Sequence, residues 1–225
     1  VAATTPAEYL QSSARTIQCF FEADAFDPSG ALRCPPLSAV SKIGHALHDL
    51  DDAFRDFTRS AKVADVFRSL SYTSPTPVQS MVMFKQSEFA SEVSAHQDSA
   101  YIFTDPLSTL GFWVALEDAC EEAGCLQVSP GSHRSGVTYR MVLQDGGPTT
   151  CFEGNAEEPP ADGYVSLPVK AGDAVIFDGA VWHRSSPNRA AATRMAYTFH
   201  SVEGSCDYDP RNWLQPGDVP FEPLY

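Results

Sequence analysis

Residues 1–70 carry apolar side chains at helical spacing. Between residues 43 and 54 these side chains are three or four positions apart, as on one face of a helix, and the same spacing returns between residues 63 and 70. Ser41 has a side chain that favours the N-cap position, so a helix is predicted directly after it, and another is predicted to begin within residues 6–21. We therefore expect residues 1–70 to be a mostly helical N-terminal support region.

The pattern changes at Pro77, where short β-type runs begin to alternate with turn residues. Runs of this length at fairly regular spacing are typical of an antiparallel sandwich or barrel, which makes the chain mainly β with flanking helices. Residues 71–203 are the expected β core, residues 204–225 an irregular C-terminal strap, and the whole is functionally one domain. The Gly-, Pro- and acid-rich residues 144–163 are expected to form a loop. The predicted strands cover residues 78–84, 101–104, 111–116, 125–128, 164–168, 173–177 and 194–202.

The charge of the chain narrows the classes of partner. The formal net charge is −14, from 15 Lys and Arg against 29 Asp and Glu, and the basic residues form no cluster. Nucleic acids and anionic lipids attract basic surfaces, so neither is an expected partner, and the phosphates of a coenzyme A thioester are also disfavoured. No run approaches the ~18 apolar residues that a membrane span needs. The composition says nothing about oligomeric state.

Cysteine usage and the N-terminus bear on location. The six cysteines form no Cys-x-x-Cys pair, which favours reduced thiols over a disulfide framework. No basic segment followed by an apolar stretch marks a secretory signal, so a cytoplasmic protein is expected. The first residue is Val1 rather than Met, and we expect the N-terminus to be truncated.

The first candidate for chemistry is the pair His96 and Asp98. In a strand, residues two apart point to the same face, so an imidazole and a carboxylate would lie side by side. Together they are half of the two-histidine, one-carboxylate triad that leaves open positions on Fe(II). With six histidines and 29 acidic residues, however, one such pair is expected by chance, and an exposed turn explains it equally well.

His183 and Arg194 are candidates for the third metal ligand and for a cation beside the metal. His183 follows an apolar hairpin that starts at Gly172-Asp173, a setting in which a histidine is commonly structural. Arg194 opens an apolar strand, and a cation that points inward there needs an anionic partner. Guanidinium suits two-point binding of a carboxylate. His-x-Asp, a distant His and an Arg on the next strand together predict a metal with three protein ligands and an anionic cosubstrate.

Several longer motifs extend this combination. Residues 92–98 resemble the first metal motif of the phytanoyl-CoA dioxygenase family, and residues 124–133 resemble its "GCL…PGSH" signature. The hairpin at residues 172–183 and the strand at residues 194–200 are similar to its last core strands. The likeness is specific over residues 77–203 and continues into runs on both sides, so it covers nearly the whole chain. Relatives carry a further N-terminal helical segment.

The resemblance implies a fold, a reaction and a ligand set. The fold is a double-stranded β-helix, the jelly-roll core that is also called cupin-like. The reaction is hydroxylation of an unidentified small molecule, with Fe(II), 2-oxoglutarate and O2, and with release of succinate and CO2. A carboxylate at Asp98 favours hydroxylation, because related halogenases have a small residue there. The implied iron ligands are His96, Asp98 and His183, and the implied 2-oxoglutarate contacts are Lys42, Met81, Trp113, Ser185 and Arg194.

Other interpretations remain open at this point. Trp113 is equally consistent with core packing, Met81 fits core packing better than ligand binding, and a lysine such as Lys42 at a helix start is usually solvated. The chain could also be a non-catalytic sensor of 2-oxoglutarate or metal, a cupin-type isomerase or hydrolase, or a purely structural barrel. Four other histidines have no assigned role: His45 and His48, which would lie one helical turn apart and could bind a metal, His133 in a turn, and His200 as an outer support of the site.

Overall fold

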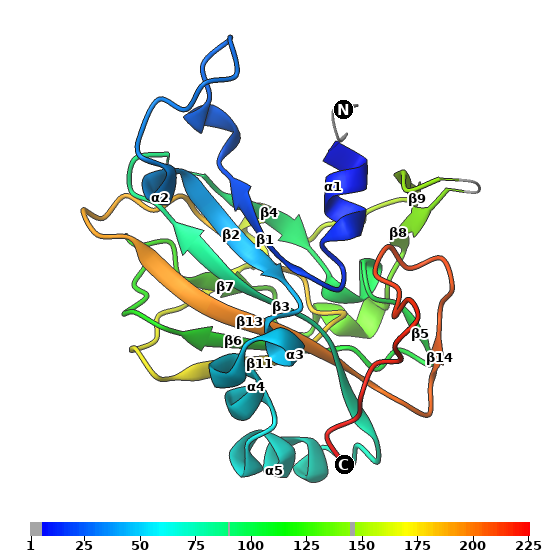
Figure 1. Ribbon diagram of the computed structural model, residues 1–225. Coiled ribbons are helices and arrows are strands. Elements are labelled where there is room, and N and C mark those ends of the chain that lie inside the picture. The colour runs from blue at the N-terminus through cyan, green and yellow to red at the C-terminus, as the bar shows by residue number, and fades with distance from the viewer. Residues whose placement is uncertain (1–5, 90, 145–146) are drawn as a thin grey trace.

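Two facing antiparallel sheets form the core of the computed structural model, which describes residues 6–89, 91–144 and 147–225 (Figure 1). In order across the sheet, the larger one contains β1 (Ile17–Phe21), β2 (Val40–His45), β3 (Pro75–Lys85), β13 (Arg194–Glu203), β6 (Leu110–Ala115) and β11 (Ala174–Asp178). The smaller one contains β10 (Val165–Leu167), β7 (Leu126–Val128), β12 (His183–Ser185) and β4 (Val93–His96). Two further pairs are β5 (Thr104–Asp105) with β14 (Asp207–Tyr208) and β8 (Tyr139–Leu143) with β9 (Thr150–Gly154). This is the expected jelly-roll core.

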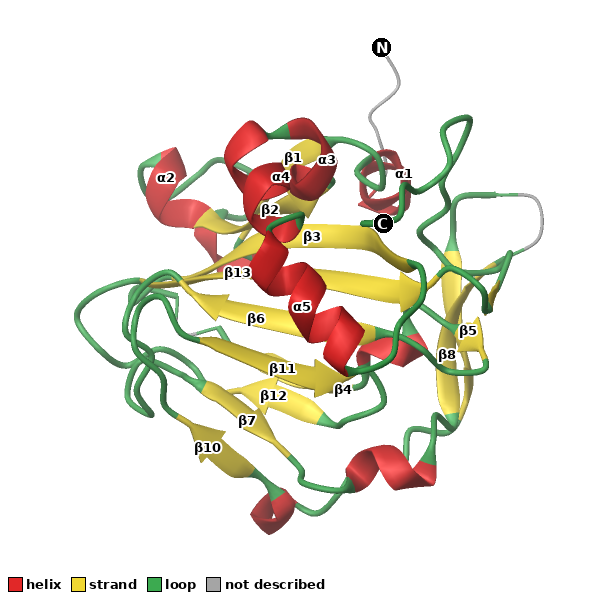
Figure 2. Cartoon of the chain, turned by 90° about the horizontal axis from the view of Figure 1, so that it is seen from below, coloured by secondary structure: helices red, strands yellow, loops and turns green. Residues whose placement is uncertain are grey.

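Helices cover the outer side of the larger sheet. Figure 2 shows α5 lying across β13 and β6, with α3 and α4 beside it. Asp51 caps α4 by accepting from the backbone N–H groups of Ala53 and Phe54, and Ser60 caps α5 in the same way. None of the helices in the described ranges has the length and apolar character that crossing a bilayer requires. The helices are α1 (Pro6–Ser12), α2 (Pro36–Ala39), α3 (Leu47–Leu50), α4 (Asp52–Thr58) and α5 (Ala61–Ser69), and short 3-10 turns are η1 (Ala23–Ala25), η2 (Asp98–Ala100), η3 (Ser132–Ser135) and η4 (Ala161–Gly163).

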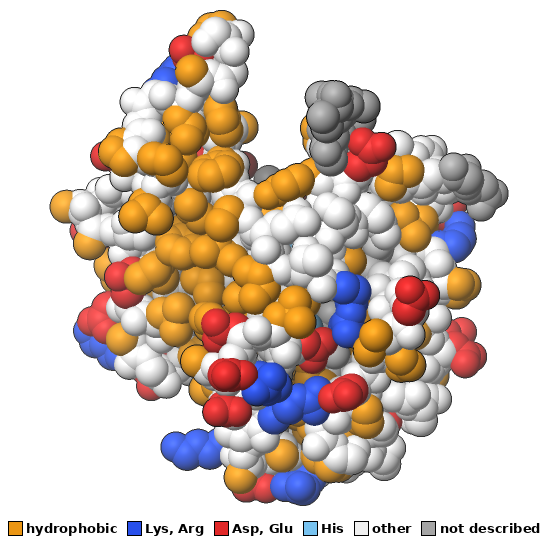
Figure 3. Space-filling view, in the orientation of Figure 1, with side chains coloured by type: hydrophobic (Ala, Val, Ile, Leu, Met, Phe, Trp, Pro, Cys, Tyr) orange, Lys and Arg blue, Asp and Glu red, His pale blue; other side chains and the backbone are white. Residues whose placement is uncertain are grey.

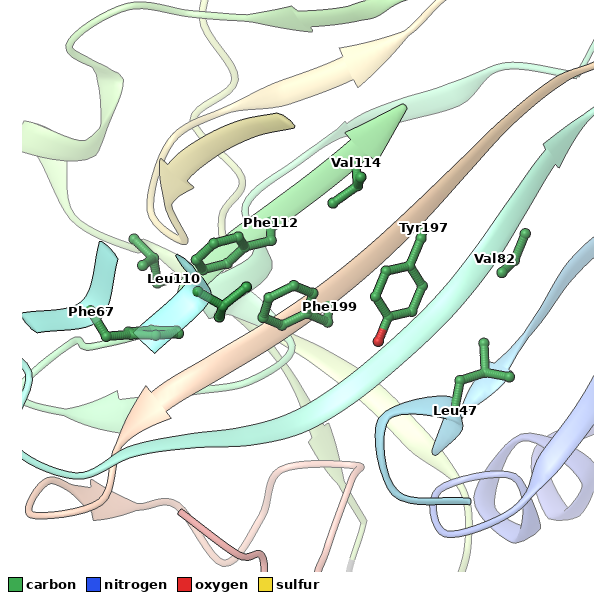
Figure 4. Packing of buried hydrophobic residues seen from close by; sticks show 9 residues of the cluster. Leu47, Phe67, Val82, Leu110, Phe112, Val114, Tyr197 and Phe199 are labelled. Atoms are coloured by element: carbon green, nitrogen blue, oxygen red, sulfur yellow. The ribbon is translucent and has the colours of Figure 1, made fainter. Parts of the chain in front are cut away.

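The main hydrophobic cluster fills the space between this sheet and the helices (Figure 4). The rings of Phe112 on β6 and Phe199 on β13 stack with centroids 4.3 Å apart. Tyr197 lies one alternation away on the same face, and its hydroxyl lies 2.7 Å from Oγ1 of Thr58 in α4. Because alternate residues of β13 serve this cluster, those between them are free to face the other sheet.

Phe199 is expected to be one of the strongest single contributors to stability. It is fully buried, and Phe199→Ala should lower the free energy of unfolding by about 3–5 kcal/mol, because a ring is lost and a cavity is left. Urea titration followed by circular dichroism measures this. Leu37→Ala, at a side chain that is 85% exposed, should change the free energy by less than about 0.5 kcal/mol. Similar losses in the two variants would contradict the assigned core.

The N-terminal region departs from the sequence prediction at one important place. The helix predicted after Ser41 is wrong, because residues Val40–His45 form strand β2, which pairs with both β1 and β3. The helix that begins at Pro6 ends at Ser12, and β1 follows it. Ile43 faces the main cluster as a strand residue, so its helical spacing from Leu47 reflected burial rather than a helix. Pairing with distant strands decided the conformation.

Two smaller predictions also need correction. Residues 101–104 are mostly a turn after η2, and only Thr104 enters a strand. Within residues 144–163, which were expected to form a loop, β9 pairs with β8. In the second case the partner strand supplies hydrogen bonds that the polar composition of the segment does not reveal.

The C-terminal segment runs back along the core. Trp213 and Leu214 are buried, at 3% and 0% exposure. The side-chain amide of Asn212 both accepts from the backbone N–H of Phe103 and donates to its carbonyl, each at 2.9 Å. Further along, the backbone N–H of Leu224 donates to Pro75 O at the start of β3. The tail is therefore fixed to the sheet and brings Trp213 into the interior.

The surface carries mixed charges and one apolar area. Figure 3 shows hydrophobic side chains over β1 and β2, where Ile17 and Phe21 are 41% and 39% exposed. On the same face, Lys and Arg side chains lie among Asp and Glu (Figure 3), as in the contact of Arg15 with Asp49 at 3.0 Å.

All six cysteines are free thiols, as the sequence predicted.

Candidate active site

The three predicted metal ligands converge between the two sheets. His96 ends β4, and His183 begins β12 directly opposite it in the antiparallel register. Asp98 lies just beyond the end of β4, at the first position of η2, so the strand alternation expected to place it does not extend that far. The turn nevertheless brings its carboxylate to the same point. One ligand atom from each residue lies within 4.8 Å of the other two, which suits a single metal ion.

The histidine rings are oriented for metal binding. Nδ1–H of His96 donates to Ser94 O at 2.8 Å, and Nδ1–H of His183 donates to Val181 O at 3.0 Å. Each bond places the proton on Nδ1 and leaves the lone pair on Nε2. The Nε2 atoms of His96 and His183 lie 3.6 and 3.5 Å from Oδ1 of Asp98. Burial, followed by the nearby His183, lowers the pKa of His96 to about 4, so its ring is neutral at physiological pH. Two imidazoles and a carboxylate are a donor set that fits Fe(II).

His200 on β13 supports the carboxylate of Asp98. Its Nε2 lies 3.0 Å from Oδ2 of Asp98, while Oδ1 faces His96 and His183. Burial alone raises the pKa of Asp98, but the attraction and hydrogen bond from His200, together with the other two histidines, hold that pKa well below its usual range. Gly111 is the strand partner of His200 on β6, and a Cβ there would lie only 3.0 Å from Oδ2, so the glycine leaves room for the carboxylate. His200 thus holds one oxygen and leaves the other for a metal.

Removing this support should weaken metal binding. His200→Phe is expected to lower the affinity for Fe(II) or Mn(II) by about 10-fold or more, because partners of metal ligands typically contribute that much. His200→Gln retains an N–H donor and should recover part of the loss. Calorimetric titration of the metal-free protein with Mn(II) measures both variants. Equal affinity in His200→Phe and the unaltered protein would show that Asp98 needs no such partner.

Arg194 lies at the start of β13 with its charge unpaired. Its guanidinium is 2% exposed, and its Nη2 donates to Gly124 O at 2.9 Å. Nε and Nη1 have no hydrogen-bond partner, although both are buried. Burial lowers the pKa of Arg194 to about 10, so the cation persists at physiological pH. A buried cation with two free donors is costly unless an anion fills the space beside it, and a carboxylate has the matching geometry.

The other four predicted cosubstrate contacts line the same cavity, of about 430 Å³, as the triad and Arg194. Trp113 on β6 lies under the guanidinium, 5.1 Å from its carbon to the ring centre. Ser185 is buried two residues after His183 on β12. Met81 is on β3, and Lys42 is on β2 with its ammonium 4.8 Å from the ring of Phe20, rather than at a solvated helix start. The structure therefore brings all eight predicted residues to one cavity.

Lys85 is a cavity residue that the sequence reasoning missed. It pairs with Arg194 across β3 and β13, and its ammonium donates to Ser91 O at 2.8 Å, Ser186 O at 2.7 Å and Ser185 O at 3.3 Å. Burial, then the positive charge of Arg194, lowers the pKa of Lys85 to about 7. Period-two alternation from Met81 predicts an inward side chain at Lys85, and this signal could have identified it. The lysine ties the ends of β4 and β12 together beside Arg194.

The remaining histidines do not form a second metal site. His45 is on β2 and His48 on α3, and the Nδ1 atoms are each 2.7 Å from a serine hydroxyl, Ser13 and Ser80 respectively. In the described part of the chain, the three residues His96, Asp98 and His183 are the one cluster with metal-ligand spacing. His133 lies in the short turn η3 and is not among the residues that line the cavity.

The sequence resembles those of known proteins over most of its length. A family model described as phytanoyl-CoA dioxygenase matches residues 3–196. Phytanoyl-CoA dioxygenase domain-containing protein 1 of Rattus norvegicus is 47% identical, over 97% of this chain and 77% of that protein. A phytanoyl-CoA dioxygenase of Arabidopsis thaliana is 40% identical, over 98% of this chain and 77% of that protein. The predicted resemblance is confirmed.

Solved structures with a similar fold come from nogalamycin biosynthesis. The epimerase SnoN, described in complex with Fe3+, alpha-ketoglutarate and a nogalamycin compound, matches with a TM-score of 0.65 and 19% identity, over 97% of this chain and 98% of that one. The alpha-ketoglutarate-dependent carbocyclase SnoK matches with a TM-score of 0.64 and 19% identity, over 100% of this chain and 86% of that one. At this identity the likeness concerns the fold.

Proposed function

The chain belongs to the phytanoyl-CoA dioxygenase family, and from this premise we propose that it is an Fe(II)- and 2-oxoglutarate-dependent oxygenase that hydroxylates a small molecule. One observation carries the proposal. Two histidine Nε2 atoms and a carboxylate oxygen converge in the cavity that also holds Arg194, a buried cation with two free donors. A site for a metal and a site for a carboxylate in one cavity are what this cosubstrate needs, since it offers a chelating end and a carboxylate end.

The residues have distinct tasks in this proposal. His96, Asp98 and His183 hold iron by three ligands and leave its other positions open. Arg194 binds the distant carboxylate of 2-oxoglutarate, and Ser185 is placed to donate to the same group. When bound, iron with 2-oxoglutarate and O2 supplies the oxidation of a C–H bond, coupled to formation of succinate and CO2. The buried walls of the cavity keep water from the reacting groups.

Trp113 and Lys42 complete the cosubstrate end. Trp113 fixes the plane of the Arg194 guanidinium from below and is itself 6% exposed, which limits the rotamers of both. Lys42 adds a second cation at the wall formed by β2 and β3, and burial lowers its pKa. Met81 fills the apolar space between the strands of this wall. These contacts orient the cosubstrate so that its chelating end meets the triad.

The test is formation of succinate from 2-oxoglutarate by the full chain under air with added Fe(II). Matched samples lack iron, and binding of 2-oxoglutarate is measured in parallel by calorimetry with Mn(II). Iron-dependent turnover is expected, at a rate that rises when a substrate is present. Binding without any turnover would favour a sensor that uses the same site. Absence of both binding and turnover would refute the proposal.

A further inference from the structure

The cavity has two ends, and the cosubstrate accounts for one of them. Arg194 pairs with Lys85 at one end of β13, and His200 pairs with Gln79 six residues further along. At about 3.3 Å per residue, these two rows are roughly 20 Å apart. Since His200 contacts Asp98, the triad lies toward the second row. A molecule bound between Arg194 and the metal therefore leaves the end beside Gln79 free for another ligand.

Two uncharged polar side chains face this free end without a partner. Gln79 is 7% exposed and His45 is 1% exposed, and both line the cavity. Across the described ranges, the side-chain amide of Gln79 makes no hydrogen bond, and neither does Nε2 of His45. A few polar groups on the wall of a largely apolar cavity orient a bound ligand, so these two, which open into one cavity, indicate a ligand there.

The hydrogen bonds of Ser13 determine which atom of His45 carries the proton. The Ser13 hydroxyl donates to Leu10 O at 2.6 Å, which uses its one proton. The 2.7 Å contact between this hydroxyl and Nδ1 of His45 must then be a bond that Nδ1–H donates. Burial, followed by Lys42, lowers the pKa of His45 to about 3, so the ring has no second proton. Nε2 of His45 is therefore a hydrogen-bond acceptor.

Apart from Asp98, His200 and the hydroxyl of Tyr101, the other side chains at this end are apolar. The edge of the His45 ring packs against Trp213, with centroids 5.1 Å apart at an interplanar angle of 77°. Lys42 is the nearest cation on the same strands. It pairs with Met83, which lies four residues closer to the Arg194 end of β3 than Gln79 does. The remaining walls at this end are contributed by Leu10, Tyr101, Ile102 and Met141.

We propose that His45 and Gln79, here called the amide subsite, bind an uncharged hydrogen-bonding group on an apolar primary substrate, such as a carboxamide. An N–H or O–H of the ligand donates to Nε2 of His45, and the Gln79 amide donates to or accepts from the same group. The subsite disfavours carboxylates and ammonium groups, because neither His45 nor Gln79 carries a charge that could pair with them after they lose their water. This inference deepens the proposed function, since it assigns the substrate class of the same cavity.

Three matched probes test it: 4-phenylbutanamide, 4-phenylbutanoate and 4-phenylbutylamine, which share a body and differ in charge. Each is titrated by ligand-observed NMR into the full chain, once with Mn(II) and 2-oxoglutarate and once without either. The amide is expected to bind at least about tenfold more tightly than the carboxylate and the amine, given the cost of burying an unpaired charge. Tighter binding of the carboxylate would overturn the proposal and assign the substrate anchor to Lys42.

Variants separate recognition from simple fit. Gln79→Leu roughly preserves the size of the side chain. It should weaken binding of the amide probe about tenfold, because one hydrogen bond is lost and the polar group of the probe is left without a partner. Gln79→Glu should move the preference toward the amine. Gln144→Leu, at an exposed position outside the cavity, should bind as the unaltered protein does. Amide binding unchanged in Gln79→Leu would refute the amide subsite.

The same titrations distinguish this inference from the proposed function. If 2-oxoglutarate binds with Mn(II) while the three probes bind equally, the amide subsite is refuted and the oxygenase assignment stands. If 2-oxoglutarate does not bind, the oxygenase assignment is refuted, and the order of the probes in the metal-free protein still decides the subsite.

Discussion

Asp98→Ala should abolish iron-dependent formation of succinate, with a loss of about 1000-fold or more. The carboxylate is the one acidic group of the triad, and without it two imidazoles remain to hold a divalent cation. A bound metal contributes several kcal/mol to its reaction, and each 1.4 kcal/mol corresponds to tenfold in rate. A second readout is thermal: added Mn(II) should raise the Tm of the unaltered protein, whereas the variant should not respond.

The matched control replaces a carboxylate outside the site. Asp65 is 73% exposed and contacts Arg68 one helical turn away, so Asp65→Ala should keep both activity and the response to metal. Retained turnover in Asp98→Ala at an unchanged metal affinity would show that a different group completes the metal site. Loss of activity in both variants would point to a fold defect rather than to chemistry.

The convergence of the candidate site residues was predictable because their sequence signals are local. His96 and Asp98 are two residues apart, and His183 and Arg194 each begin a strand in a segment rich in β-forming residues. The turn at Asp98 shows that the chemical pattern was a better guide than the assumed strand. Short motifs of this kind keep their meaning when the detailed backbone differs from the expected one.

The end of the cavity beside Gln79 was not predictable, and the reason is physical. His45 has its place because β2 pairs with both β1 and β3, and those pairings join segments far apart in the chain. Its tautomer depends on Ser13, and the wall beside it depends on Trp213 from the C-terminal tail. Periodicity around Ser41 favoured a helix, which turns these side chains in other directions. Contacts of this range are set by tertiary packing, so they appear only in the folded structure.

Arg194→Leu is expected to raise the Kd for 2-oxoglutarate about 100-fold or more, while the affinity for Mn(II) stays within about threefold. Nη2 is already held by Gly124, so the guanidinium is fixed before the ligand arrives, and Nε and Nη1 are free to bind one carboxylate at two points. Charged hydrogen bonds of this kind contribute about 1.5–3 kcal/mol each. Calorimetry with Mn(II) present measures both affinities on one sample.

The stability of the ligand-free variant gives this prediction its strongest control. In the absence of an anion, Arg194 is a buried cation with two unsatisfied donors, which costs the fold free energy rather than supplying it. Arg194→Leu should therefore leave the free energy of unfolding within about 1 kcal/mol of the unaltered value, or raise it, although the cosubstrate no longer binds. Arg194→Lys, which keeps the charge but has one donor group in place of the planar fork, should recover part of the affinity. A marked loss of stability in Arg194→Leu would mean that the arginine holds the sheet together and that its open donors are incidental. Unchanged stability with lost binding would mean that the fold retains an unfavourable cation because the cosubstrate neutralises it.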